Sequence, residues 1–291
     1  MNDCKYTITD IISSLPLVRR VLKYRQRYWR EHFITHGLLR KRCNLDAIEV
    51  EAIYWGSLTP IKSREYVNLT LNLALIDLAI LGNKLEGNLI PSLHWSRRFE
   101  YPSIYYHCGL RTFPKLRILD AGAGLNPFQV LLAMLGHIVV SLDNDITSIT
   151  KLQRIMHDLK IKLYPCLADI TQIPFKDNFF DRTICISVIE HILDYLNPQF
   201  HPGISYLILK AILCELSRVT KPQGKICITL DVDLGGRHHA SPNEIKILGD
   251  LLGVKIPPLP KDALISNKVP LGTLFADNKA VLTIILSKKY M

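Results

Sequence analysis

Short apolar runs alternate with longer amphipathic stretches from residue 116 to the end of the chain. The longer stretches place apolar residues at helical spacing, whereas the runs have the length and composition of strands. The expected strands are residues 117–121, 137–142, 162–167, 182–188, 225–230 and 280–287. This alternation is typical of β-α-β units, in which helices connect parallel strands and cover both faces of the sheet. The sequence therefore predicts an α/β fold with a mostly parallel sheet.

The first 112 residues have a different pattern. Apolar residues recur there at helical spacing in residues 11–30, 45–54, 63–81 and 95–106. Ligands of open α/β sheets bind outside the carboxyl ends of the strands. We therefore expect residues 1–112 to form a helical lid and acceptor-binding region over that edge, and residues 113–291 to form the sheet domain.

Neither a membrane span nor a secretory signal is expected. The longest apolar stretch, residues 69–81, is interrupted by Asn72 and Asp77 and is shorter than the roughly 20 residues that cross a bilayer. The polar segment 1–10 lacks the basic-then-apolar order of a signal peptide. The sequence therefore predicts a cytoplasmic protein without a membrane partner.

The seven cysteines include no Cys-x-x-Cys pair, and several lie inside apolar runs. This placement indicates reduced cysteines in the core of the protein and no structural metal site.

The formal net charge is +10, and many of the basic residues are concentrated in residues 19–42, which contain only Glu31 as an acid. Such a local charge favours an anionic partner, which can be a small molecule, a peptide or a nucleic acid. A solvated helix face is the alternative interpretation of this basic segment.

A glycine loop follows the first strand of the sheet domain. Residues 116–126 run from apolar residues through Asp120 to Gly122 and Gly124, and a helix is expected to begin at Asn126. Glycine permits positive φ and close approach of a ligand to the backbone. The loop lacks the third glycine of a dinucleotide site, and the chain lacks the Gly-Lys-Ser/Thr of a triphosphate site. Asp143 ends the next strand, 21 residues after Gly122, where a carboxylate can accept both hydroxyls of a ribose.

Residues 116–291 resemble the class I S-adenosylmethionine methyltransferases, in particular the broad small-molecule group. The motifs that carry the resemblance are Ile118-Leu-Asp-Ala-Gly-Ala-Gly124, Asp143, Ala168-Asp169-Ile170, Phe179-Phe-Asp181, Ser187-Val-Ile-Glu-His-Ile192 and residues 216–224. The resemblance implies a Rossmann-like, mostly parallel sheet of seven strands.

The resemblance also implies how the cofactor, S-adenosylmethionine, is bound. Gly122, Ala123 and Gly124 would line its methionine part, and Asp120 would orient the ammonium group. The remaining expected cofactor contacts are Asp143 and Asn144 at the ribose, Asp169 and Ile170 at the adenine, Ser187 at the methionine end and Tyr101 from the N-terminal region. Each residue also has a local alternative, since aspartate caps turns and helices, glycine serves tight turns and aromatic residues pack in cores.

His191 is the candidate catalytic residue. It follows Glu190 at the end of the fourth strand, and a histidine titrates near neutral pH, so it can act as a base if the acceptor must lose a proton. Shaping the pocket or capping a helix is the alternative role. Arg98 is a further candidate pocket residue, and Arg237, His238 and His239 are candidates for binding an acidic acceptor.

The sequence therefore predicts a methyltransferase that acts on an oxygen or nitrogen of a small molecule or peptide, with an anionic acceptor such as a carboxylate favoured by the basic segments. Three alternatives remain: an RNA methyltransferase, a catalytically inactive binding protein with this fold, and a nicotinamide oxidoreductase. The intact cofactor motifs disfavour the second alternative, and the missing third glycine disfavours the last.

Overall fold

The computed structural model describes residues 48–55, 64–81, 96–111, 115–191, 202–233, 240–258 and 279–288. All of them belong to one compact unit, Asn44–Met291. The expected division near residue 112 falls inside this unit. The expected helix at 11–30 and the basic residues 19–42 lie outside the described residues.

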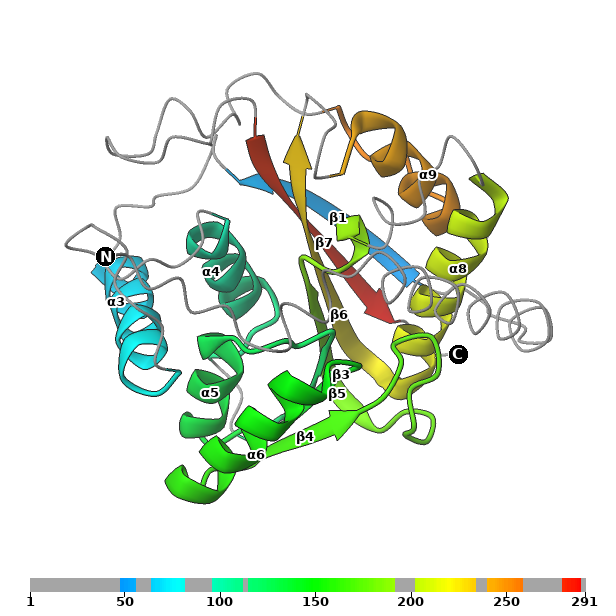
Figure 1. Ribbon diagram of the computed structural model, residues 1–291. Coiled ribbons are helices and arrows are strands. Elements are labelled where there is room, and N and C mark those ends of the chain that lie inside the picture. The colour runs from blue at the N-terminus through cyan, green and yellow to red at the C-terminus, as the bar shows by residue number, and fades with distance from the viewer. Residues whose placement is uncertain are drawn as a thin grey trace, which may run out of the picture. The chain divides into compact units, whose positions relative to one another are not determined.

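The described part of the chain forms a seven-stranded sheet with helices on both faces (Figure 1). The strands are β1 (Ile48–Trp55), β2 (Arg117–Ala121), β3 (Ile138–Asp143), β4 (Leu163–Leu167), β5 (Phe180–Ile186), β6 (Thr220–Asp233) and β7 (Lys279–Lys288). Their order in the sheet is β1-β7-β6-β5-β2-β3-β4. Strands β2 to β6 are parallel to their neighbours among themselves, and β7 is antiparallel to both β6 and β1. The predicted α/β fold with a mostly parallel, Rossmann-like sheet is confirmed.

The helices are α3 (Arg64–Ala79), α4 (Arg97–His107), α5 (Pro127–Met134), α6 (Ile146–Leu159), α8 (Pro202–Val219) and α9 (Pro242–Leu252). Figure 1 shows α3, α4, α5 and α6 on one face of the sheet and α8 and α9 on the other. None of these helices is long and apolar enough to cross a membrane. The expected start of a helix at Asn126 is confirmed, because the Asn126 side chain caps α5 and Pro127 occupies its first turn.

The first strand of the sheet corrects one prediction. Residues 45–54 were expected to be helical, but residues Ile48–Trp55 form β1, which pairs antiparallel with β7 at the edge of the sheet. The run begins with alternating apolar and acidic residues, and it is rich in β-branched and aromatic side chains, both of which favour a strand. The region before residue 112 therefore contributes a strand to the sheet and is not entirely helical.

The hydrophobic core joins α3 and α4 to the sheet. Leu73 on α3, Tyr101 and Ile104 on α4, and Phe128 on α5 belong to the same buried cluster as the sheet residue Ile118. The Tyr101 and Phe128 rings are stacked with their centroids 4.9 Å apart. This packing holds α4 against the helix that follows the glycine loop.

A disulfide within the described part of the chain corrects the prediction that the cysteines are reduced. Cys108, directly after α4, is bonded to Cys227 in β6, and their Cα atoms are 6.8 Å apart. The two residues are 119 positions apart in the sequence, so no local spacing indicates this pair. Cys166 and Cys185 are free. No group of three potential ligand residues is arranged to hold a metal ion within the described residues.

Candidate functional site

The carboxyl ends of parallel strands bring several predicted site residues to one edge of the sheet. Asp120 precedes the last residue of β2, and Asp143 is the last residue of β3. Ser187 directly follows β5. Because β2 pairs in parallel with both β3 and β5, these ends lie next to one another. This is the edge at which open α/β sheets bind their ligands.

The glycine loop is held against the end of β3. The amides of Gly122 and Ala123 donate to the Leu142 carbonyl at 2.8 and 3.0 Å, and the Gly124 amide donates to Asp143 Oδ2 at 2.7 Å. Gly122 and Gly124 both have positive φ, at 74° and 52°. A Cβ at Gly122 would lie 2.5 Å from a methyl carbon of Val188, whereas a Cβ at Gly124 would have no atom within 4 Å. The loop is therefore tightly packed at its first glycine and open at its second.

Asp120 is a buried carboxyl at the base of this loop. Its Oδ2 accepts from Asn126 Nδ2 at 3.3 Å, and the same amide group donates to the Ala123 carbonyl at 2.6 Å. Burial raises the pKa of Asp120 to about 7, against the opposing effect of the Asn126 hydrogen bond. Asn126 was not among the predicted site residues. Its position before Pro127 indicated only a helix start, and its contact with Asp120 depends on the folded loop.

The residues expected at the ribose and the adenine follow β3 and β4. Asp143 accepts from the backbone amides of Gly124 and Asp145, and Asn144 is exposed. Asp169 is exposed and accepts from the Thr171 amide and hydroxyl, both at 2.7 Å. The Ala168 amide donates to the Asp143 carbonyl at 2.9 Å. The segment Ala168-Asp169-Ile170 therefore starts beside Asp143, and Asp169 also stabilises a local turn.

Helix α4 contributes a charged network that the sequence did not predict. Glu100 is fully buried and accepts from Ser187 Oγ at 2.5 Å and from Thr229 Oγ1 at 2.6 Å. Arg97, one turn earlier on α4, forms an ion pair with it. Burial raises the pKa of Glu100, but the charge of Arg97 and the hydrogen bonds outweigh burial and lower it overall. The spacing of Arg97 and Glu100 predicts one helix face, but not the partners of Glu100, which are 87 and 129 residues away.

Tyr101, the predicted cofactor contact from α4, has its ring in the core against Phe128. The guanidinium carbon of Arg97 lies 6.0 Å from the centroid of this ring. Tyr101 therefore packs α4 onto α5, as the alternative interpretation of this aromatic residue predicts.

Two further carboxyls are buried at the ends of β5 and β6. Glu190 lies in a helical turn that begins at Ile189, after β5, and its Oε1 accepts from the Asp231 amide in β6 at 3.3 Å. Burial and the neighbouring Asp231 raise the pKa of Glu190 well above its usual value. Burial and the charge of Glu100 raise the pKa of Asp231 to about 8. Neither residue was predicted, although Glu190 was noted as the neighbour of His191.

His191, the predicted catalytic residue, is exposed, whereas Glu190 beside it is fully buried. The structure thus turns the carboxyl of Glu190 inward at this edge and leaves the imidazole of His191 outside. The other candidate acceptor residues, Arg237, His238 and His239, lie outside the described residues, as does the side chain of Arg98.

Residues 119–228 match the family described as Methyltransferase domain. They contain the glycine loop, Asp143, Asp169, Ser187 and the turn with Glu190 in the order of the motifs. The match covers less than half of the 291-residue chain.

The methyltransferase domain has relatives among known proteins. An uncharacterised protein of Methanocaldococcus jannaschii is 30% identical over 113 residues, which are 39% of this chain and 40% of that protein. The match therefore spans less than half of that relative's length.

Among solved structures, the 1,6-didemethyltoxoflavin-N1-methyltransferase of Burkholderia thailandensis, with bound S-adenosylhomocysteine, is 12% identical with a TM-score of 0.46. The similarity covers 82% of this chain and 96% of that chain. A TehB-like SAM-dependent methyltransferase of Corynebacterium glutamicum is 16% identical with a TM-score of 0.43, over 79% of this chain and 100% of that chain. At these values the solved structures say nothing about the acceptor of this protein.

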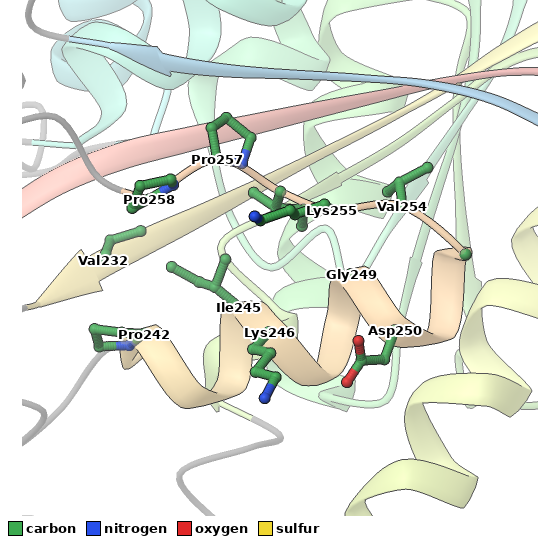
Figure 2. Close-up of a pocket in the computed structure, with 12 residues that line it drawn as sticks. Val232, Pro242, Ile245, Lys246, Gly249, Asp250, Val254, Lys255, Pro257 and Pro258 are labelled. Atoms are coloured by element: carbon green, nitrogen blue, oxygen red, sulfur yellow. The ribbon is translucent and has the colours of Figure 1, made fainter.

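A cavity of about 870 Å³ lies beyond the matched methyltransferase segment, between α9, the end of β6 and residues 254–258 (Figure 2). Its wall includes Val232, Ile245 and Pro257. Figure 2 shows the side chains of Lys246 and Asp250 on the side of α9 away from Pro257. The residues that line this cavity include none of the predicted site residues, so it is separate from the site at the ends of β2, β3 and β5.

Proposed function

We propose that this protein transfers a methyl group from S-adenosylmethionine to an oxygen or nitrogen of a small molecule or peptide. The observation that carries the proposal is the hydrogen bond from the Gly124 amide to Asp143 Oδ2. It joins the glycine loop, which would hold the methionine part, to the carboxylate that would accept the ribose hydroxyls. The match of residues 119–228 to the methyltransferase domain family supports the same assignment.

The residues at this edge fit such a cofactor. Open space beside Gly124, where a Cβ would meet no atom within 4 Å, allows a ligand to approach the backbone. Asp120 is a buried carboxyl with a pKa raised to about 7, and a nearby cation would stabilise its ionised form. The ammonium group of the methionine part supplies such a cation. Asp120 would therefore orient the ammonium, and Gly122, Ala123 and Gly124 would line the methionine part.

The protein's own contribution to the reaction is mainly positional. Bound S-adenosylmethionine supplies an electrophilic methyl group on a sulfonium. The loop, Asp143 and Asp169 would hold that group in place, while α4 would close the methionine end through the contact of Glu100 with Ser187. Alignment of acceptor, methyl and sulfur can lower the activation free energy by on the order of 7 to 11 kcal/mol.

Residues 1–112 would supply the lid and part of the acceptor site. Helix α4 supports this role, because its Glu100 reaches both Ser187 after β5 and Thr229 in β6. The predictions of an anionic acceptor and of an RNA substrate both depend on basic residues outside the described part of the chain.

Calorimetric titration of the protein with S-adenosylmethionine and, separately, with NAD tests this proposal. We expect micromolar binding of S-adenosylmethionine and no binding of NAD. Asp143→Asn should weaken the binding about 10- to 100-fold, the effect of losing hydrogen bonds to a charged group. Asp145→Asn is the matched control, because Asp145 is an exposed helix cap two residues away and asparagine caps helices equally well.

Binding of NAD in place of S-adenosylmethionine would contradict the proposal, and so would equal effects of the two variants. Transfer of a labelled methyl group from the bound cofactor then distinguishes an enzyme from an inactive binding protein with the same fold.

A further inference from the structure

The edge formed by the ends of β5 and β6 is lined by acids. Glu100, Glu190, Asp231 and Asp120 are each no more than 3% exposed, and they face a single described cation, Arg97, which is paired with Glu100. In the sheet order, β5 and β6 lie on the opposite side of β2 from β3 and β4. The proposed cofactor contacts run from β4 and β3 across β2 to Ser187, so the turn with Glu190 and the end of β6 lie beyond the methionine end, where the acceptor would bind.

Only one of the two carboxyl oxygens of Glu190 has a hydrogen-bond partner among the described residues. Its Oε1 accepts from the Asp231 amide. Its Oε2 is buried and has no hydrogen-bond partner among the residues that the structure describes. Buried polar atoms in folded proteins are nearly always hydrogen-bonded, and each exception needs an explanation such as strain, a catalytic role, or a bound water or ion. Glu190 Oε2 is thus an acceptor at the proposed reaction edge that still lacks a donor.

The charged groups around Glu190 come from several elements. Glu100 acts on it from α4 and Asp231 from β6, and the thiol of Cys185 lies near it on β5. Arg97 on α4 and Asp120 on β2 act on other members of the group. Burial, followed by the charges of Asp231 and Glu100, raises the pKa of Glu190 well above its usual value and so favours the protonated carboxyl. A bound cation would replace this proton, because an opposite charge stabilises the carboxylate. A bound anion would instead require the proton to stay on the Glu190 carboxyl.

We propose that the acceptor is an amine, and that Glu190 Oε2 accepts a hydrogen bond from its nitrogen. This inference rests on the proposed methyltransferase function and specifies its acceptor. It assigns the acceptor a positive charge before reaction, in contrast to the anionic acceptor expected from the basic segments of the sequence.

The proton balance follows from this contact. The acceptor enters as an ammonium ion, and the Glu190 and Asp231 carboxyls release a proton to solvent when it binds. The ionised pair then takes one proton from the ammonium and frees the nitrogen lone pair. That lone pair forms the new bond to the methyl carbon while the carbon–sulfur bond breaks, and its electrons stay on sulfur. The methylated nitrogen leaves as a positively charged ammonium ion, so the proton released on binding is the net proton of the reaction.

The test uses the full chain saturated with S-adenosylhomocysteine, which fills the proposed cofactor site without supplying a methyl group. Thermal unfolding is measured with methylamine, benzylamine or spermidine, and with acetate, benzoate or citrate, at about pH 6 and about pH 8. We expect at least one amine, and no carboxylate, to raise the melting temperature in a concentration-dependent way. The apparent affinity of that amine should be higher at the higher pH, because its binding displaces a proton.

Glu190→Gln should weaken amine binding about 10- to 100-fold, as expected for a hydrogen bond between charged groups, and should remove its pH dependence. Glu244→Gln is the matched control, since Glu244 is a buried carboxylate in the capping box of α9 and glutamine serves the same motif. Stabilisation by carboxylates, the absence of any amine effect, or unchanged amine binding in Glu190→Gln would overturn the inference. If the variant does not fold, the comparison of amines with carboxylates on the wild type still tests the inference about the acceptor.

Failure of the proposed function gives a different result. In that case S-adenosylhomocysteine itself would not raise the melting temperature of the wild type. Binding of S-adenosylhomocysteine without amine binding overturns only the inference about the acceptor.

Discussion

Glu190 and His191 are neighbours in the sequence with opposite environments. The sequence favoured His191 as a base because a histidine ordinarily titrates near neutral pH. In the folded chain the imidazole is exposed, and the Glu190 carboxyl is fully buried. Burial shifts a carboxyl into the range where it can exchange protons at neutral pH. The residue type did not indicate these different environments, because the direction of each side chain depends on the turn after β5.

Gly122 and Gly136 allow a direct test of the packing at the glycine loop. Both have positive φ, but a Cβ at Gly122 would lie 2.5 Å from a Val188 methyl carbon, and one at Gly136 would meet no atom within 4 Å. Gly122→Ala should lower the free energy of unfolding by about 2 to 5 kcal/mol, from backbone strain and overpacking together. Gly136→Ala should lower it by about 1 to 2 kcal/mol, from backbone strain alone.

Denaturant unfolding measures both changes, and calorimetry shows whether only Gly122→Ala loses S-adenosylmethionine binding. Equal destabilisation by the two substitutions would show that the contact with Val188 adds nothing to the cost of a side chain at Gly122.

At the scale of elements, α4 is attached to the sheet at both ends. Near its start, Glu100 binds Ser187 and Thr229. After its end, Cys108 is bonded to Cys227, and Arg182 Nε donates to the Cys108 carbonyl at 2.7 Å. The sequence predicted the helix itself from its periodicity. Its attachment depends on residues of β5 and β6 far along the chain, which periodicity does not identify.

His137 joins the segment after α4 to the start of β2. It is buried; its Nδ1 accepts from the Leu116 amide at 3.2 Å, and its Nε2 lies 3.0 Å from the Leu110 carbonyl. Nε2 therefore carries the proton, and protonation of Nδ1 would break the bond from Leu116. Burial lowers the pKa of His137. Because the unfolded chain then binds the proton more tightly, the contribution of His137 to stability is complete above about pH 6.5 and is lost as the pH falls towards the lower folded-state pKa.

His137→Gln should reduce this loss of stability at acidic pH, since glutamine does not titrate. At neutral pH it should lower the free energy of unfolding by about 1 to 3 kcal/mol, because buried backbone groups lose a partner. Denaturant unfolding over a range of pH measures both effects. His157→Gln, at an exposed histidine of α6, should leave the profile unchanged, and the same profile for wild type and His137→Gln would refute the assignment.

At the scale of the whole molecule, segments before residue 112 take part in the same sheet and core as the segments after it. β1 pairs with β7 along its full length, and α4 packs in the same buried cluster as α5 and the sheet. A sheet domain that began at residue 113 would expose the edge of β7 and remove the partners of Phe128 and Ser187. The unit that contains the whole sheet begins at Asn44.

A chain that starts at residue 44 should therefore unfold cooperatively and keep S-adenosylmethionine binding, whereas a chain that starts at residue 113 should be insoluble or lack both properties. Thermal unfolding and calorimetry of the two chains check this. A stable, cofactor-binding chain from residue 113 would restore the division that the sequence suggested.

The sequence by itself determined the alternation of strands and helices after residue 116, the glycine loop and the acids at the ends of β2 and β3. These features depend on side-chain period and turn chemistry within a few residues, which are local. Only the tertiary structure decided the place of β1 beside β7, the disulfide of Cys108 with Cys227, the binding of Glu100 by Ser187 and Thr229, and the burial of Glu190. Each of these depends on contacts between distant segments or on the direction of a side chain in the folded turn. Such groups come together only when the core forms.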